Sequence, residues 1–142
     1  MIKVMRKSII LSVVLLLLST FTAVAQNRVY QLSSHILDIN TGRPAPGVKI
    51  VLSKLVDENK WNVVEERVTD DNGRVKDFLE KKQNVDNRGV YKLTYCVEPY
   101  FRQQSQDTFY PFIEVVFEIK DESHYHVPIT LSPYGYSTYR GS

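Results

Sequence analysis

The sequence predicts an all-β domain, an antiparallel sandwich or barrel of seven or eight short strands. Segments rich in β-branched and aromatic residues alternate apolar with polar positions, which is the period of a half-buried strand. Turn signals made of Gly, Pro, Asn and Asp recur about every eight to twelve residues. No long segment repeats its apolar residues at helical spacing, so a helical domain is excluded.

The first 25 residues have the three parts of a secretory signal peptide. Residues 1–7 carry three basic residues and no acid, residues 9–18 are mostly apolar, and Ala23-Val24-Ala25 supplies a small-residue cleavage site. The apolar run is too short for a transmembrane anchor, which needs ~20 apolar residues. We therefore predict cleavage after Ala25, a periplasmic or secreted protein, no remaining membrane segment, and one domain at residues 26–142.

The charge of the domain gives no sign of a nucleic-acid partner. The whole chain of 142 residues has a formal net charge of +2, and loss of the three leader bases changes this to −1. No basic stripe follows the signal peptide. A near-neutral domain of this kind does not have the composition of a nucleic-acid-binding protein.

The chain has a single cysteine, Cys96, so it cannot form an internal disulfide. Stability in an oxidising compartment must then come from packing or from subunit assembly. Cys96 lies in the apolar segment Tyr91–Val97, and we interpret it as a small core residue. A disulfide between two chains stays open as an alternative.

Three strands are expected in the first half of the domain, at Tyr30–Ile39, Val48–Val56 and Trp61–Thr69. The second of these alternates most clearly. The segment between the first two strands, Asn40–Gly47, concentrates Gly and Pro and predicts a turn. The charged residues Asp57–Lys60 predict the next turn.

A tight turn is expected at Asp70–Gly73, because Asn-Gly is the strongest short hairpin signal. Arg74 follows it directly. Residues 78–87 are charged and weakly patterned, which predicts a loop with a short edge strand. Gly89–Val97 alternates clearly as a strand, and Glu98–Gln106 is the one place for a short helix.

A strong strand is expected at Phe109–Ile119, followed by a turn at Asp121–Ser123. If this strand is an unprotected sheet edge, it invites pairing with another subunit. Residues 124–142 have the composition of a β-hairpin, and they hold several side chains with functional groups, among them two histidines and an arginine. Chain ends are usually frayed, so something must hold this hairpin in place.

All three histidines are candidates for function. His124 and His126 are two residues apart and can share one side of a strand, and His35 lies in the first strand. Three histidines can bind zinc with an open position for water, although no acid or cysteine completes a firm pattern here. We interpret His124 as an exposed hairpin residue. For His35 and His126, a hydrogen-bonded core histidine and a functional one both stay open.

Arg74 stands at a strand entry, where a rigid turn can aim it at an anion or a carbonyl group. A solvated surface residue is the alternative, and Arg140 has the same two interpretations. Tyr139 and Ser142 are ordinary tail residues by pattern alone. The chain has no nucleophile elbow, no phosphate-binding loop and no Cys–His pair.

The tail HVPITLSPYGYSTYRGS resembles the C-terminal signature of the 5-hydroxyisourate hydrolases, the transthyretin-like proteins of purine catabolism. The final Tyr-Arg-Gly-Ser is their most distinctive mark and separates them from the hormone-carrying transthyretins. LSSHILDINTGRPAPGV, TDDNGR and FYPFIEVVFEI resemble three further family segments, so the resemblance covers nearly all of the domain. The departures, at Ile36, Asn40 and Phe112-Ile113, fall outside the presumed site positions.

This resemblance implies a transthyretin-like antiparallel β-sandwich of two four-stranded sheets with one short helix. It also implies a homotetramer with its sites in a channel between subunits. Such an assembly would explain why an exported domain with one cysteine needs no disulfide.

The resemblance implies hydrolysis of 5-hydroxyisourate to 2-oxo-4-hydroxy-4-carboxy-5-ureidoimidazoline in urate catabolism, with no metal or organic cofactor. Carried over by motif, His35, Arg74, His126 and Ser142 are catalytic residues, and Tyr139 binds substrate together with His35 and Arg74. Either His35 or His126 would activate the water. A non-enzymatic carrier of a small aromatic ligand is the alternative, and a zinc hydrolase built on the three histidines is a third hypothesis.

Overall fold

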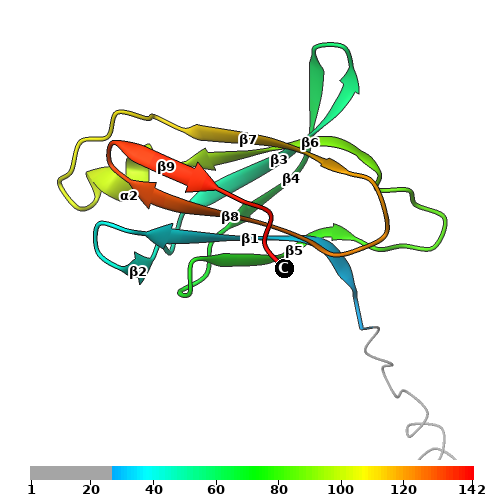
Figure 1. Ribbon diagram of the computed structural model, residues 1–142, viewed down its shortest axis with the longest axis horizontal. Coiled ribbons are helices and arrows are strands. Elements are labelled where there is room, and N and C mark those ends of the chain that lie inside the picture. The colour runs from blue at the N-terminus through cyan, green and yellow to red at the C-terminus, as the bar shows by residue number, and fades with distance from the viewer. Residues whose placement is uncertain (1–26) are drawn as a thin grey trace, which may run out of the picture.

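A computed structural model describes residues 27–142, so the predicted signal peptide lies outside the described residues. This part of the chain forms two β-sheets packed face to face, with one short helix at one end (Figure 1). The elements run in the following order: β1 Tyr30–Asp38, β2 Arg43–Pro44, β3 Lys49–Asp57, β4 Lys60–Val68, β5 Arg74–Glu80, β6 Gly89–Cys96, α2 Glu98–Arg102, β7 Ile113–Ile119, β8 Tyr125–Ser132 and β9 Gly135–Thr138.

The first sheet is built around β1. Its neighbour on one edge is β8, which runs parallel to it, and β9 pairs antiparallel beyond β8. The two-residue β2 and the longer β5 both pair antiparallel with β1 and share its other edge. The sheet has five strands in the described chain but is four strands wide.

The second sheet has the antiparallel order β4-β3-β6-β7. Apolar side chains from both sheets fill the space between them, and the largest fully buried ones are Tyr91, Tyr95, Phe78, Phe101 and Leu32. The two predicted four-stranded sheets are thus confirmed, with the short β2 as an addition. Burial of such side chains stabilises the sandwich by about 1.5–3 kcal/mol each.

One polar network lies in the core and joins strands of the two sheets. The hydroxyl groups of Ser34 and Tyr95 lie 2.9 Å apart, and both donate to the carbonyl oxygen of Val127, at 2.8 and 3.0 Å. Burial raises the pKa of Tyr95, so its hydroxyl stays protonated. These bonds tie β1, β6 and β8 together across the sandwich.

The tight turn expected at Asp70–Gly73 is confirmed, although it does not join the two strands of a hairpin. The strand before it, β4, belongs to the second sheet, and the strand after it, β5, belongs to the first. The amide of Ile36 donates to the carbonyl oxygen of Gly73 at 2.9 Å, which docks the turn against β1. The turn therefore carries the chain from one sheet to the other.

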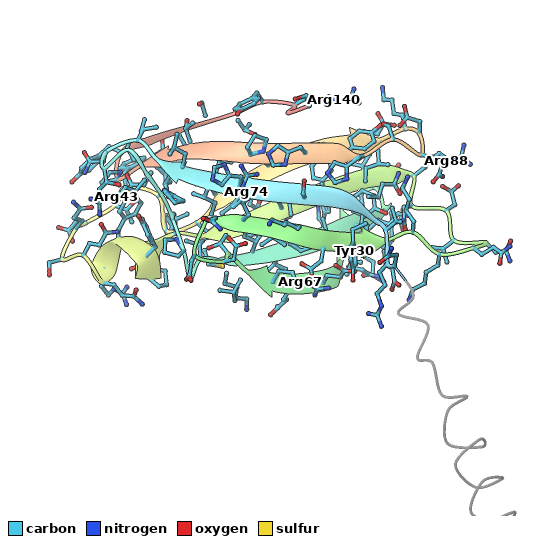
Figure 2. All side chains as sticks on the ribbon, turned by 90° about the horizontal axis from the view of Figure 1, so that it is seen from below. Tyr30, Arg43, Arg67, Arg74, Arg88 and Arg140 are labelled. Atoms are coloured by element: carbon cyan, nitrogen blue, oxygen red, sulfur yellow. The ribbon has the colours of Figure 1, made fainter. Side chains whose placement is uncertain are left out.

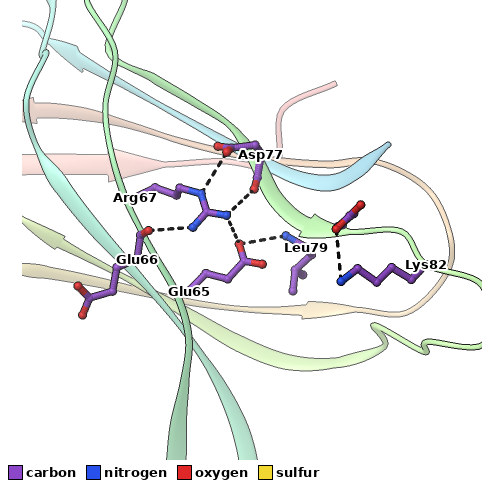
Figure 3. A network of polar contacts seen from close by, with 7 residues as sticks. Glu65, Glu66, Arg67, Asp77, Leu79 and Lys82 are labelled. Carbon is purple, nitrogen blue, oxygen red and sulfur yellow. Dashed lines mark hydrogen bonds and ion pairs between the residues drawn. The ribbon is translucent and has the colours of Figure 1, made fainter. Parts of the chain in front are cut away.

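A polar network joins β4 to β5 beside this crossing (Figure 3). The Arg67 guanidinium donates through Nε to Asp77 Oδ2 at 3.1 Å, and its Nη2 lies 3.3 Å from Glu65 Oε2. The same Glu65 oxygen accepts from the amide of Leu79 at 3.4 Å. These contacts fix β5 against the other sheet, and β5 begins at Arg74.

The predicted helix is confirmed and is shorter than expected, at Glu98–Arg102. Pro99 lies in its first turn, where the missing N–H costs nothing, and Phe101 anchors it in the core. The strand expected at Phe109–Ile119 begins only at Ile113. Pro111 cannot donate a ladder hydrogen bond, which accounts for the late start.

The loop with a short edge strand expected at residues 78–87 is confirmed: β5 ends at Glu80, and residues 81–87 form a loop. One further expectation needs correction. Cys96 is not a core residue: it is half-buried on the outward face of β6, while its neighbours Tyr95 and Val97 are buried. Strand alternation places the even-numbered residues of this segment outside.

Residues 27–142 contain no helix with the length and apolar character that a membrane crossing requires.

Candidate active site

Five polar side chains share one face of the first sheet because of its register. His35 pairs with Arg74 of β5, and Ser33 pairs with His126 of β8. Directly paired residues point to the same side of a sheet, as do residues two apart on one strand. His124 lies just before β8, and its Nε2 is 2.8 Å from Ser33 Oγ on the same face.

This face is the outer one. The residues of β1 that alternate with Ser33 and His35 are Leu32, Ser34 and Ile36, and all three are buried between the sheets. The imidazoles of His35 and His126 are half-buried, so they are partly shielded from water and still accessible.

The Asp70–Gly73 turn holds the backbone of Arg74. The Asp70 carboxylate accepts the amides of Asn72 and Arg74, both at 2.9 Å, and these bonds hold the pKa of Asp70 below its usual range, that to Arg74 most. Gly73 has a φ of 66°, and a Cβ there would lie 2.6 Å from the carbonyl oxygen of Ile36. Only glycine fits this close approach.

The Arg74 side chain is exposed at the sheet of β1, β5 and β8 (Figure 2). None of the ion pairs formed within residues 27–142 includes it. Its charge is therefore free to bind an anionic or carbonyl oxygen.

Both half-buried histidines favour the neutral form. Burial lowers the pKa of His35, and the neighbouring Arg74 charge lowers it further. Burial also lowers the pKa of His126. Electrostatic interactions with Arg74, His35 and His124 lower it further, in that order of size. Backbone contacts oppose these effects, from Asn72 at His35 and from Ser33 at His126. Neutral imidazoles are the form that accepts a proton from water.

Ser33 links two of the histidines. Its Oγ lies 2.8 Å from Nδ1 of His126 and 2.8 Å from Nε2 of His124. The other ring nitrogen of His124, Nδ1, lies 3.1 Å from the carbonyl oxygen of Tyr30. His124 is exposed, as expected, yet both of its ring nitrogens have partners.

The C-terminal tail docks on His126. The amide of Gly141 donates to the carbonyl oxygen of His126 at 2.9 Å and forms an isolated β-bridge there. Tyr139 and Ser142 are exposed on either side of this contact. These bonds give the tail an anchor beside the histidines.

The Arg140 side chain lies over the ring of Tyr125. Its guanidinium carbon lies 4.9 Å from the ring centre of Tyr125. Together with Tyr139, these residues line an apolar cleft at the open edge between β7 and the terminal segment. None of the five polar residues of the sheet face lines this cleft.

No group of three His, Cys, Asp or Glu side chains in residues 27–142 is arranged to hold a metal ion. The three histidines thus do not form the ligand set that the zinc hypothesis requires. Two of them are bonded to Ser33 instead.

The structure brings His35, Arg74 and His126 together on one sheet face. The catalytic roles predicted for these three residues stay predictions, as do the roles predicted for the exposed Tyr139 and Ser142. Sequence reasoning missed Ser33 and Gly141. Ser33 stands two residues before His35 on the same strand, so period-2 alternation could have included it.

The sequence profile of the HIUase/Transthyretin family matches residues 32–141. The chain belongs to this family. A probable 5-hydroxyisourate hydrolase of Caenorhabditis elegans is 47% identical over 112 residues, covering 78% of this chain and 81% of that protein.

Two solved structures with the same fold extend the comparison. The 5-hydroxyisourate hydrolase of Klebsiella pneumoniae has a TM-score of 0.64 and 35% identity, over 78% of this chain and 98% of that chain. Sea bream transthyretin in complex with thyroxine has a TM-score of 0.71 and 28% identity, over 78% and 94%. The fold thus includes both hydrolases and a hormone-binding protein, and the site residues must distinguish them.

Proposed function

We propose that this protein hydrolyses 5-hydroxyisourate to 2-oxo-4-hydroxy-4-carboxy-5-ureidoimidazoline, as a step of urate catabolism. The observation that carries the proposal is the convergence of His35, Arg74 and His126 on one sheet face, beside a docked Tyr-Arg-Gly-Ser tail. The names of the similar hydrolases agree with it.

The substrate is a flat oxidised purine whose six-membered ring contains an activated acyl–nitrogen bond. In the proposed reaction His126 takes a proton from water, and the resulting hydroxide attacks the ring carbonyl carbon. The carbon–nitrogen bond then breaks, the ring nitrogen takes up the proton, and the carbonyl carbon becomes a carboxylate. His126 is preferred over His35 as the base because Ser33 orients its ring.

Arg74 has the role of stabilising the oxyanion that develops on the attacked carbonyl. It is always charged, and its side chain is free of ion pairs within residues 27–142. His35 binds the substrate on the same face, Tyr139 contacts it, and Ser142 closes the site. No metal or organic cofactor has a part in this scheme.

The proposal includes an exported homotetramer whose sites lie between subunits. Two features support assembly: β7 and β9 are unpaired edges of the two sheets in the described chain, and the apolar cleft lies between them. Export rests on the composition of residues 1–25.

The alternative is a carrier of a small aromatic ligand, which the likeness to thyroxine-bound transthyretin favours. A carrier has no need for two histidines and an arginine on one face. Freshly generated 5-hydroxyisourate, followed by its ultraviolet absorbance, separates the two functions. We expect the chain to accelerate the decay, with or without a chelator, and Arg74→Ala and His126→Ala to lose this rate while folded. Decay no faster than in buffer would reject the hydrolase.

A further inference from the structure

We infer that Ser33 and His124 are positioning residues that set the tautomer of His126. Through them, neutral His126 keeps its proton on Nδ1 and presents the lone pair of Nε2 to the substrate side. The inference rests on the proposed function for its catalytic meaning, but the tautomer itself is measurable without any activity.

A continuous chain of hydrogen bonds runs along the outer face of the sheet. It begins at the carbonyl oxygen of Tyr30, which lies 3.1 Å from Nδ1 of His124. Nε2 of the same ring lies 2.8 Å from Ser33 Oγ, and that oxygen lies 2.8 Å from Nδ1 of His126. The two inner groups, His124 and Ser33, each have one partner on either side.

The direction of every bond follows from the first. A carbonyl oxygen can only accept, so Nδ1 of His124 carries a proton. A neutral imidazole has only one N–H, so Nε2 of His124 is bare and accepts the hydroxyl proton of Ser33. That hydroxyl has one proton to give, so Ser33 Oγ accepts from Nδ1–H of His126. The remaining nitrogen of His126, Nε2, then has the free lone pair.

The lone pair is the group that a general base needs, and the wrong tautomer would present an N–H to the water instead. The charged and titratable groups that face His126 are Arg74, His35 and His124. Burial lowers the pKa of His126 most, and each of these three residues lowers it further. They favour the neutral ring without choosing between its two tautomers. Ser33 and His124 make that choice.

Long-range ¹H–¹⁵N spectra of the full chain labelled with ¹⁵N-histidine test the inference directly. The chain has three histidines, so single substitutions assign every signal. The spectra are recorded at about pH 8.5, well above the ordinary imidazole pKa of about 6.5. We expect Nδ1–H and bare Nε2 for His124 and His126.

Two substitutions break the chain at different points. Ser33→Ala removes the acceptor of Nδ1–H, and His124→Ala frees the Ser33 hydroxyl to donate to His126. Both variants should give His126 a substantial Nε2–H population, and Ser33→Thr should restore the wild-type signals. Ser137→Ala is the matched control, since Ser137 is an exposed serine of the same sheet whose Oγ lies 2.6 Å from Thr130 Oγ1.

With 5-hydroxyisourate, Ser33→Ala and His124→Ala should lower kcat by about tenfold or more, with little change in KM. Ser33→Thr and Ser137→Ala should keep the wild-type kcat. An Nε2–H tautomer in wild-type His126, or an unchanged tautomer in both variants, would overturn the inference. A changed tautomer with undiminished kcat would overturn the positioning role. A wild-type chain without activity would reject the proposed function, and the spectra would still decide the tautomer.

Discussion

The backbone of Gly141 lies directly against His126, and there is no room for a side chain at this position. Its amide donates to the His126 carbonyl oxygen at 2.9 Å, and an added Cβ would overlap Cδ2 of the ring and lie 3.1 Å from Cγ. Glycine is thus the residue that lets the tail lie flat on the histidine. The tail and the polar face of β1 and β8 are therefore one unit.

Gly141→Ala should reduce hydrolysis and leave the fold intact. The added methyl group forces the His126 ring to move, and small displacements of catalytic groups can cost about 10²-fold in rate. We expect a fall in kcat of about tenfold or more with an unchanged circular dichroism spectrum. Gly135→Ala is the control, because its nearest atom, Ser132 Oγ, is 3.6 Å from the added Cβ. Equal kcat values in the two variants would show that the close contact between Gly141 and the His126 ring has no effect on the rate.

Deletion of residues 139–142 should abolish activity without unfolding the sandwich. The last strand ends at Thr138, and Tyr139, Arg140 and Ser142 are exposed, so the deletion removes little of the core. It does remove the Gly141 anchor beside His126. Circular dichroism and thermal unfolding check the fold, and the ultraviolet assay checks the rate. Full activity of the shortened chain would show that the tail is not part of the site.

Arg74→Ala should lower kcat by about 10²–10³, the range for loss of one oxyanion donor. Arg74→Lys should recover only part of this, because lysine keeps the charge without the planar fork. Since Arg74 is exposed, the unfolding midpoint of the Arg74→Ala protein should hardly differ from that of the wild type. Arg43 is an exposed arginine on β2, the other strand that pairs with this edge of β1. Arg43→Ala serves as the control and should keep full activity. An active, folded Arg74→Ala variant would remove the arginine from the mechanism.

Gly73→Ala should destabilise the protein and also displace Arg74. The residue has a φ of 66°, and an added Cβ would lie 2.6 Å from the Ile36 carbonyl oxygen and 2.9 Å from the Ala45 amide nitrogen. We expect a loss of about 1–3 kcal/mol in the free energy of unfolding by urea titration. Gly47→Ala isolates the clash, since Gly47 has a φ of 73° and open space around it. Equal losses in the two variants would mean that backbone strain alone explains the effect.

The lowered pKa values of His35 and His126 make activity and stability fall in acid. Their folded pKa values lie below about 6.5, so the unfolded chain takes up protons first as the pH falls. The free energy of unfolding should therefore decline from about pH 6.5 down to the folded pKa values. Proton NMR titration of His126 should give a pKa below that of free histidine, and Arg74→Gln should raise it. A wild-type value at or above about 6.5 would contradict the effect of burial and charge.

Local sequence patterns determined much of the fold. Period-2 alternation placed the strands, the lack of β-branched residues in Glu98–Gln106 marked the short helix, and Asp70–Gly73 marked a tight turn. The resemblance of three separate segments to one family selected His35, Arg74 and His126, and only the last of these lies in the tail. The same alternation, applied residue by residue, would have moved Cys96 out of the core, since Tyr95 and Val97 point inward.

Only the tertiary structure decided which side chains meet. The turn before Arg74 joins two sheets and not one hairpin, because strand partners depend on packing across the core and not on the turn residues. The ladder between β1 and β5 also shifts register between Leu32 and Ser34. Without this shift Val75 would stand opposite His35, and Arg74 would point into the core.

The sequence by itself determined the residue types of the site and the strands that carry them. It could not determine the parallel pairing of β1 with β8, which puts Ser33 beside His126, nor the docking of Gly141 on that histidine. Both contacts join residues more than ten positions apart in the chain, so no local spacing records them. Their physical cause is the closing of two sheets over a shared apolar core, which fixes the register of every strand at once.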